Sequence, residues 1–101
     1  MIDIREFNSN DIDIDNFKVH ISIQSRTAKK FITNITGIPE KYDIEKILRF
    51  IKKVYHCSGS VLKDDNENKF IKLSGDQRQN VKTFFIEKNV MEEDNIIVHG
   101  Y

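Results

Sequence analysis

A short basic stretch, SRTAKK at residues 25–30, is the first feature of this sequence that suggests chemistry. Guanidinium and ammonium groups keep their charge at physiological pH, and both bind phosphate oxygens. A second group of cations recurs at three- and four-residue spacings between residues 46 and 53, which places them on one side of a helix. The two groups are Arg26, Lys29 and Lys30, and then Lys46, Arg49, Lys52 and Lys53. Together they predict a surface that binds a polyanion such as the backbone of RNA.

Residues that could support catalysis or hold a metal are scattered along the chain. His56 and Cys57 look like a base beside a nucleophile, but adjacent side chains at a helix end point in different directions. The three histidines lack the i, i+4 spacing with which two imidazoles bind one metal. Asp64, Asp65 and Glu67 lack the spacing and the glycine of a calcium loop. We therefore predict no catalytic residue, no metal site and no cofactor.

Length and composition predict a single domain with mixed charge. The chain has 101 residues, of which 32% are charged, and its formal net charge is zero. Its one cysteine excludes an internal disulfide. The first residues, MIDIREF, lack the pattern of a signal peptide, and no window approaches the length of a membrane span. We expect a cytosolic or nuclear protein, monomeric when free, that makes no contact with a membrane.

The zero net charge conceals a segregated distribution. Residues 1–16 carry five acids against one arginine, whereas residues 17–53 carry nine cations against three acids. Residues 54–101 carry six cations against eight acids. We expect residues 1–16 to form a flexible acidic tail, although the alternating DIDID could also be a strand. The domain is predicted to span residues 17–101, and its positive part is where binding is expected.

The elements that position the first basic group are two strands. Apolar residues alternate with polar ones in VHISIQ and again in FITNIT, the pattern of half-buried strands. SRTAKK is then a hairpin tip between antiparallel strands. After Gly37 and Pro39, a helix is predicted to begin near Tyr42 and Asp43 and to end at Ser58-Gly59. Its core stripe is predicted to comprise Ile44, Ile47, Leu48, Ile51, Val54 and Tyr55.

The second half repeats this arrangement. SVL and FIKL predict a hairpin around the polar loop KDDNENK. In SGDQRQN, Ser74 or Asp76 is placed to cap a helix, with Gln77 or Gln79 completing a capping box. Val81, Phe84 and Phe85 give that helix an apolar face, MEEDN closes it, and IIV supplies a last strand. The order β-β-α-β-β-α-β predicts an α+β two-layer sandwich: a five-stranded, mostly antiparallel sheet with both helices on one face.

The basic segment lacks the run of aromatic residues with which many RNA-binding domains stack on bases, and this absence indicates which kind of RNA contact to expect. It has no RNP1-like run of stacking aromatics, so we expect recognition of backbone and shape in a folded RNA. The alternative for the helix cations is a solubilising face without a ligand. A protein partner with an acidic surface is a further alternative for the whole basic side.

Four runs in this sequence resemble the SUI-domain family of eukaryotic translation initiation factor 1. They are VHISIQSRTAKKFITNITGIPEKYDIEKIL, HCSGSV, KLSGDQRQNV and IIVHGY, in unbroken order from Phe17 to the last residue. The resemblance implies a non-enzymatic, cytoplasmic factor that binds the small ribosomal subunit near the P site. Such a factor promotes scanning, keeps initiator tRNA from engaging fully until a start codon is paired, and then leaves. The implied partners are ribosomal RNA, initiation factors 1A, 2, 3 and 5, and, nearby, initiator tRNA.

The resemblance assigns the family's basic hairpin loop to Arg26, Lys29 and Lys30, and its basic first helix to Lys46, Arg49, Lys52 and Lys53. Asp76, Arg78 and Gly100 are further predicted contacts for start-codon fidelity. A helix cap at Asp76 and a turn at Gly75 would explain two of the four GDQR positions by structure alone. A close backbone approach would explain Gly100 in the same way.

The chain departs from the family pattern at several of these places. Thr27 and Ala28 replace the usual Asn-Gly of the loop, so either Ala28 is strained or the turn is rearranged. Lys29 stands for arginine and loses its bidentate fork. Glu45 stands where a cation is common, and the second hairpin tip, Asn66–Asn68, is unusually polar. These departures leave a SUI-type module for protein interaction, or one that dampens translation without codon discrimination, as alternatives to an initiation factor.

Overall fold

The structure is a computed structural model that describes residues 17–100. The predicted acidic tail, its alternative DIDID strand and Tyr101 lie outside the described residues. Within the described part of the chain, neither helix is long and apolar enough to cross a membrane.

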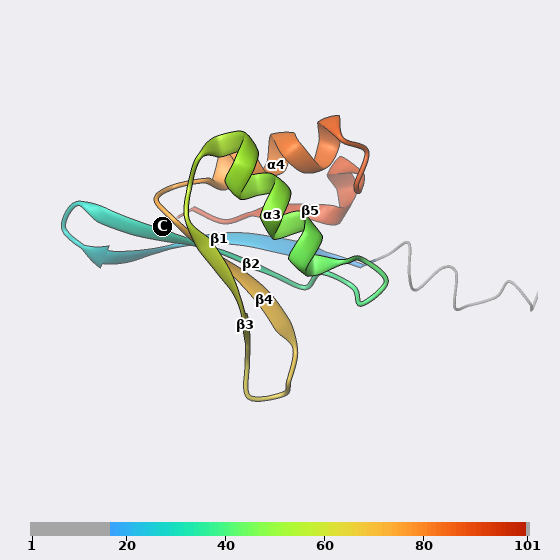
Figure 1. Cartoon of the computed structure of the whole chain (residues 1–101), viewed down its shortest axis with the longest axis horizontal. Helices are drawn as coiled ribbons and strands as arrows, with labels where there is room; N and C mark the ends of the chain where they lie inside the picture. The colour runs from blue at the N-terminus through green and yellow to red at the C-terminus, as the bar shows by residue number, and fades with distance from the viewer. Residues whose placement is uncertain (1–16, 101) are drawn as a thin grey trace, which may run out of the picture.

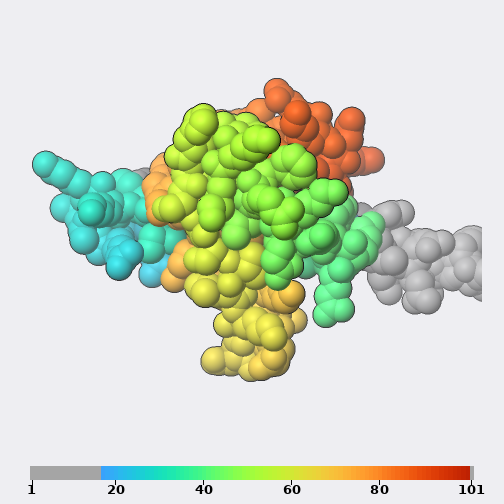
Figure 2. Space-filling view, in the orientation of Figure 1, coloured from blue at the N-terminus to red at the C-terminus, as the bar shows by residue number. Residues whose placement is uncertain are grey.

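The sheet contains five strands in the order β3-β4-β2-β1-β5, as Figure 1 shows. The strands are β1 (Val19–Thr27), β2 (Lys30–Thr36), β3 (Gly59–Lys63), β4 (Lys69–Ser74) and β5 (Ile96–Val98). Three of the four pairings are antiparallel, and β5 runs parallel to β1. The predicted α+β fold with a mostly antiparallel sheet and two helices is therefore confirmed. Both hairpins, β1-β2 and β3-β4, project beyond the body of the domain (Figures 1 and 2).

The first helix, α3 (Ile44–Tyr55), begins where Asp43 caps it. The Asp43 carboxylate accepts a hydrogen bond from the backbone N–H of Lys46 at 3.1 Å. The helix ends earlier than predicted, because His56 adopts a left-handed conformation with φ 53° and breaks the helical hydrogen bonding. Gly59, which we expected to end this helix, instead opens β3.

Gly59 matters because α3 packs closely over it. A Cβ at this position would lie 2.7 Å from the carbonyl oxygen of Lys72 and 2.7 Å from a methyl group of Leu73. It would also lie 3.2 Å from a methyl group of Leu48 on α3. Glycine therefore sets the distance between the helix and this edge of the sheet.

The core lies between one face of the sheet and the two helices. Strands β1, β2 and β4 each bury two alternate residues fully, as period-2 patterning predicts, and α4 (Arg78–Glu87) adds its predicted apolar face. The buried hydrophobic residues are Val19, Ile21, Ile35, Ile44, Ile47, Leu48, Ile51, Ile71, Leu73, Val81, Phe84, Phe85, Met91 and Ile96. Met91 precedes the short 3-10 helix η1 (Glu93–Asn95) and belongs to the core, although its polar neighbours predicted only a helix end.

One predicted core residue of α3 is exposed. Val54 is 46% exposed and Phe50 is 47% exposed, whereas Tyr55 packs against the core. At 100° per residue, Val54 lies about 80° around the helix from Ile44, so it falls outside the buried stripe on the side of α4. The prediction that Val54 is a core residue was wrong, and the apolar surface of α3 continues past the core to Phe50.

Candidate nucleic-acid interface

The turn of the β1-β2 hairpin is shorter than the six-residue SRTAKK tip that the sequence predicted. Strand β1 continues to Thr27, Thr27 pairs with Lys30, and only Ala28 and Lys29 form the turn. A register shift between Ser25 and Thr27 marks a β-bulge. Ala28 is not among the described residues with positive φ, so the turn is rearranged rather than strained at this alanine.

All three hairpin cations, Arg26, Lys29 and Lys30, are exposed on this projecting tip. Within the described part of the chain, none of them makes an ion pair or a side-chain hydrogen bond. A cation without an internal partner contributes its full charge to the surface potential and is free to meet a phosphate.

The four helix cations, Lys46, Arg49, Lys52 and Lys53, are also exposed, and they too lack internal ion pairs among residues 17–100. The structure divides them into two pairs. Lys46 and Lys53 border an apolar groove that also contains Phe50 and Val54. Arg49 and Lys52 point away from that groove, on the side where Glu45 pairs with Lys69 across 3.1 Å. Hydrogen bonding from Lys69 lowers the pKa of Glu45, so Glu45 remains a negative charge beside the cations.

A short chain of backbone hydrogen bonds connects the two basic elements. The carbonyl of Ser58, just after α3, accepts from the N–H of Ser74 at 2.9 Å. The next residue, Gly75, donates its N–H to the carbonyl of Phe31 at 2.8 Å, beside Lys30. These two bonds connect the C-terminal end of α3 to the base of the cationic hairpin. That both elements form one basic side stays a prediction.

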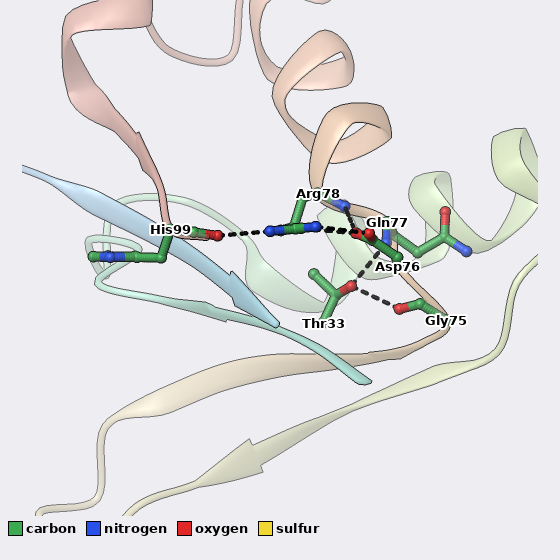
Figure 3. A network of polar contacts seen from close by, with 6 residues as sticks. All are labelled: Thr33, Gly75, Asp76, Gln77, Arg78 and His99. Atoms are coloured by element: carbon green, nitrogen blue, oxygen red, sulfur yellow. Dashed lines mark hydrogen bonds and ion pairs between the residues drawn. The ribbon is translucent and has the colours of Figure 1, made fainter. Parts of the chain in front are cut away.

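The GDQR run forms a polar network that joins three parts of the fold (Figure 3). The hydroxyl of Thr33 in β2 donates to the carbonyl of Gly75 at 2.7 Å and accepts from the N–H of Gln77 at 2.8 Å. The guanidinium of Arg78 makes two contacts with the Asp76 carboxylate, at 2.9 and 2.8 Å, and donates to the carbonyl of His99 at 2.9 Å. Its side chain is only 19% exposed. These hydrogen bonds hold β2, the start of α4 and the segment after β5 together.

The predicted capping box at the start of α4 is not formed. Gln77 is the N-cap residue, and no side chain of the capping positions bonds to the helix as a box requires. The Asp76 carboxylate is held instead by the Arg78 guanidinium, whose hydrogen bonds lower the pKa of Asp76. It accepts the N–H of Arg78 only at 3.3 Å. Thr33, from a distant strand, satisfies the Gln77 N–H, which no local sequence pattern could indicate.

The two glycines near this network differ. Gly75 has φ +84°, so it is the predicted turn residue. A Cβ added at Gly100 would have no atom within 4 Å, so the predicted close backbone approach is absent within the described residues. A role for Asp76, Arg78 or Gly100 in contacting a ligand stays a prediction.

The residues considered for catalysis and metal binding have structural explanations. Burial raises the pKa of the Cys57 thiol, which disfavours the thiolate. The Asp64 carboxylate accepts the N–H groups of Asn66 and Asn68 at 2.8 and 3.0 Å and so organises the β3-β4 turn. Among residues 17–100, no three His, Cys, Asp or Glu side chains gather as a metal site would require.

Two features were missed by sequence reasoning. The rings of His20 and His99 stack, with their Nδ1 and Nε2 atoms 2.9 Å apart. The parallel pairing of β5 with β1 brings these residues together, and no local signal predicts that pairing. The other missed feature is the exposed position of Phe50. The sequence offered a signal for it, because Phe50 falls at helical spacing between Lys46 and Lys53 on the cationic side of the helix.

The sequence model of one protein family, described as Translation initiation factor SUI1, matches residues 15–91. The chain belongs to this SUI1 family. The SUI1 match includes both basic elements and the GDQR run, and it ends before β5.

Two SUI1 relatives align with most of this chain. A protein translation factor SUI1 homolog of Acanthamoeba polyphaga mimivirus is 47% identical over 85 residues, which is 83% of this chain and 80% of the relative. The eukaryotic translation initiation factor eIF-1 of Saccharomyces cerevisiae is 40% identical over 83 residues, covering 82% and 77%. The fold also resembles the solved C-terminal domain of human eIF2D, with a TM-score of 0.68 at 13% identity, over 80% of this chain and 42% of that one.

Proposed function

We propose that this SUI1-family protein is a translation initiation factor that binds the small ribosomal subunit near the P site, promotes scanning and raises the fidelity of start-codon selection. The observation that supports this most directly is the joined pair of cationic elements, whose side chains have no internal partners in the described part of the chain. The names of the family and of its yeast member also support a role in translation initiation.

In this proposal the hairpin tip meets the backbone of ribosomal RNA. Arg26, Lys29 and Lys30 project from a two-stranded scaffold, so little backbone entropy is lost when they bind. The helix extends the contact through Arg49 and Lys52, with Lys46 and Lys53 on its other edge. Phosphate contacts position a protein without reading sequence, which suits a factor that must sit at one place on a folded RNA.

The factor acts in the cytoplasm, without a chemical step, together with initiation factors 1A, 2, 3 and 5. Initiator tRNA is its neighbour on the subunit, and Asp76, Arg78 and Gly100 are candidates for supporting fidelity. We assign Arg78 and Asp76 an indirect role, because their side chains are engaged with each other and with the segment after β5.

A start-codon assay tests the function. A eukaryotic extract depleted of its own factor receives this protein, and translation is compared between reporters that begin with AUG and with UUG. We expect the protein to restore AUG initiation and to lower the UUG-to-AUG ratio. A uniform fall in translation from both reporters would contradict the proposal and favour a dampening module, and no effect on either would favour a protein-interaction module.

A further inference from the structure

An apolar groove runs between α3 and α4, with a volume of about 660 Å³. Its floor and walls include Phe50, Val54 and Phe84, of which the first two are nearly half exposed. Figure 2 shows the surface of α3 facing the viewer, with α4 in orange beside it. Large apolar side chains gathered at the surface of a small domain indicate a binding site.

The rim of this groove is cationic. Lys46 and Lys53 border it from α3, and Lys88 borders it from the end of α4. Asp43 is the one acidic residue of the lining, and its carboxylate caps α3. An occupant should therefore combine apolar side chains with negative charge.

A second hollow connects the groove with the first described residue. This hollow, of about 570 Å³, is lined by Phe17 and Lys41 and shares Tyr42 and Val90 with the groove. Phe17 packs edge-on against Tyr42 with ring centroids 5.8 Å apart, and the Lys41 ammonium lies 5.7 Å from the Phe17 ring centre. The chain that precedes Phe17 thus joins the domain at the mouth of a path into the groove.

Residues 1–16 have the composition that the groove requires. Five acids alternate or mingle with Ile2, Ile4, Phe7, Ile12 and Ile14. In an extended DIDID, successive side chains point to opposite sides, so the isoleucines can face the groove while the acids face the long lysine side chains of the rim. The twelve residues of α3 span roughly 18 Å, a distance that about six extended residues cover.

We propose that the acidic segment of residues 1–16 binds in cis along the groove between α3 and α4. Ile12 and Ile14 pack against Phe50 and Val54, and Asp11, Asp13 and Asp15 pair with the lysines of the rim. The segment then neutralises Lys46 and Lys53, two of the seven cations assigned above to RNA, so it competes with RNA for the α3 surface. This last consequence rests on the proposed function, whereas the docking itself does not.

The docking is tested by paramagnetic relaxation in the full chain. A nitroxide is attached at Ser9→Cys in a Cys57→Ala background, and amide signals are compared between the oxidised and reduced label. We expect strong attenuation at residues 46–54 and 84–90, beyond that seen around Phe17. The variant Asp11→Asn, Asp13→Asn, Asp15→Asn with the same label should lose this attenuation, as should Val54→Ser. The control Asp65→Asn, Glu67→Gln removes two exposed acids in the β3-β4 turn, away from the groove, and should retain it.

Several results would overturn the proposal. Attenuation confined to the surroundings of Phe17, or unchanged when the three aspartates are neutralised, would show that the groove is not occupied by this segment. Attenuation of an unlabelled, isotope-enriched chain by a labelled second copy would show docking between molecules. Absence of the effect at high salt alone would instead agree with the charge pairing.

Binding to small ribosomal subunits then separates the docking from the proposed function. With both correct, the triple aspartate-to-asparagine variant binds subunits severalfold more tightly than the wild type, because the competing segment is released. If attenuation in the groove persists while no variant binds subunits, the docking stands and the proposed function fails. If subunits bind equally in both forms, the competition with RNA at Lys46 and Lys53 is refuted.

Discussion

At the scale of single residues, Arg78 has a structural role in the GDQR run that its sequence position did not indicate. Sequence reasoning predicted it as the exposed contact of that run, since its neighbours had structural explanations. The structure joins its guanidinium to Asp76 and to the carbonyl of His99, which lies 21 residues later. Partners this distant depend on tertiary packing, so no spacing rule could identify them. Lysine would keep the charge but lose the fork that makes three hydrogen bonds at once.

Stability should depend on pH through Asp76. Its pKa is lowered in the folded protein, chiefly by hydrogen bonds from Arg78. The pairing therefore stabilises the fold fully above the ordinary pKa near 3.8, and this contribution is lost as pH falls through the lower folded value. We expect Asp76→Asn to lose about 1–2 kcal/mol at pH 7, discounted for partial exposure, and the gap to the wild type to close below about pH 4.

Urea denaturation across pH 2.5–7 measures this gap. The control is Asp65→Asn, whose carboxylate makes no hydrogen bond within the described residues. A gap between wild type and Asp76→Asn that does not change with pH would contradict the assignment.

At the scale of elements, the pattern of apolar residues located all five described strands and both α-helices, whereas the 3-10 helix η1 was not predicted. Alternation found β1 and β2, short apolar runs beside polar segments found the other strands, and the 3.6-residue stripe found α3. The predictions from periodicity failed at the edge of the apolar stripe and where the backbone adopts a left-handed conformation. Val54 sits at the edge of the stripe, and His56 takes a left-handed conformation that its residue type does not announce. The cap of α4 came from Thr33, which belongs to another strand.

The contact between α3 and β3 should tolerate no side chain at Gly59. Alanine there would place its Cβ 2.7 Å from the backbone carbonyl of Lys72, so the strand or the helix must shift. We expect Gly59→Ala to lower the free energy of unfolding by about 1–3 kcal/mol. Gly100→Ala is the matched control, because its Cβ would enter open space, and we expect it to change stability by less than about 0.5 kcal/mol. Equal thermal stability of the two variants would refute the packing argument.

At the scale of the whole molecule, charge segregation is the property that sequence and structure share most clearly. In this neutral chain, residues 17–53 carry nine cations against three acids, whereas residues 1–16 and residues 54–101 each carry more acids than cations. Summing charge by segment predicted a basic side from the sequence alone. The split of the helix cations by the apolar groove was not predictable in this way, because it depends on where α4 packs beside α3.

Co-sedimentation with purified eukaryotic small subunits over a salt series shows whether the hairpin tip binds ribosomal RNA. The wild type is compared with Arg26→Glu, Lys29→Glu, Lys30→Glu and with the control Lys63→Glu on the other hairpin. We predict saturable binding that fades with salt, weaker binding by the triple variant, and a log–log salt slope reduced by about one for each cation that meets a phosphate. The control should bind like the wild type, and all three proteins should melt alike, since the tip lies outside the core. Absent binding, or binding that changes neither with salt nor in the triple variant, would contradict RNA binding through the hairpin tip.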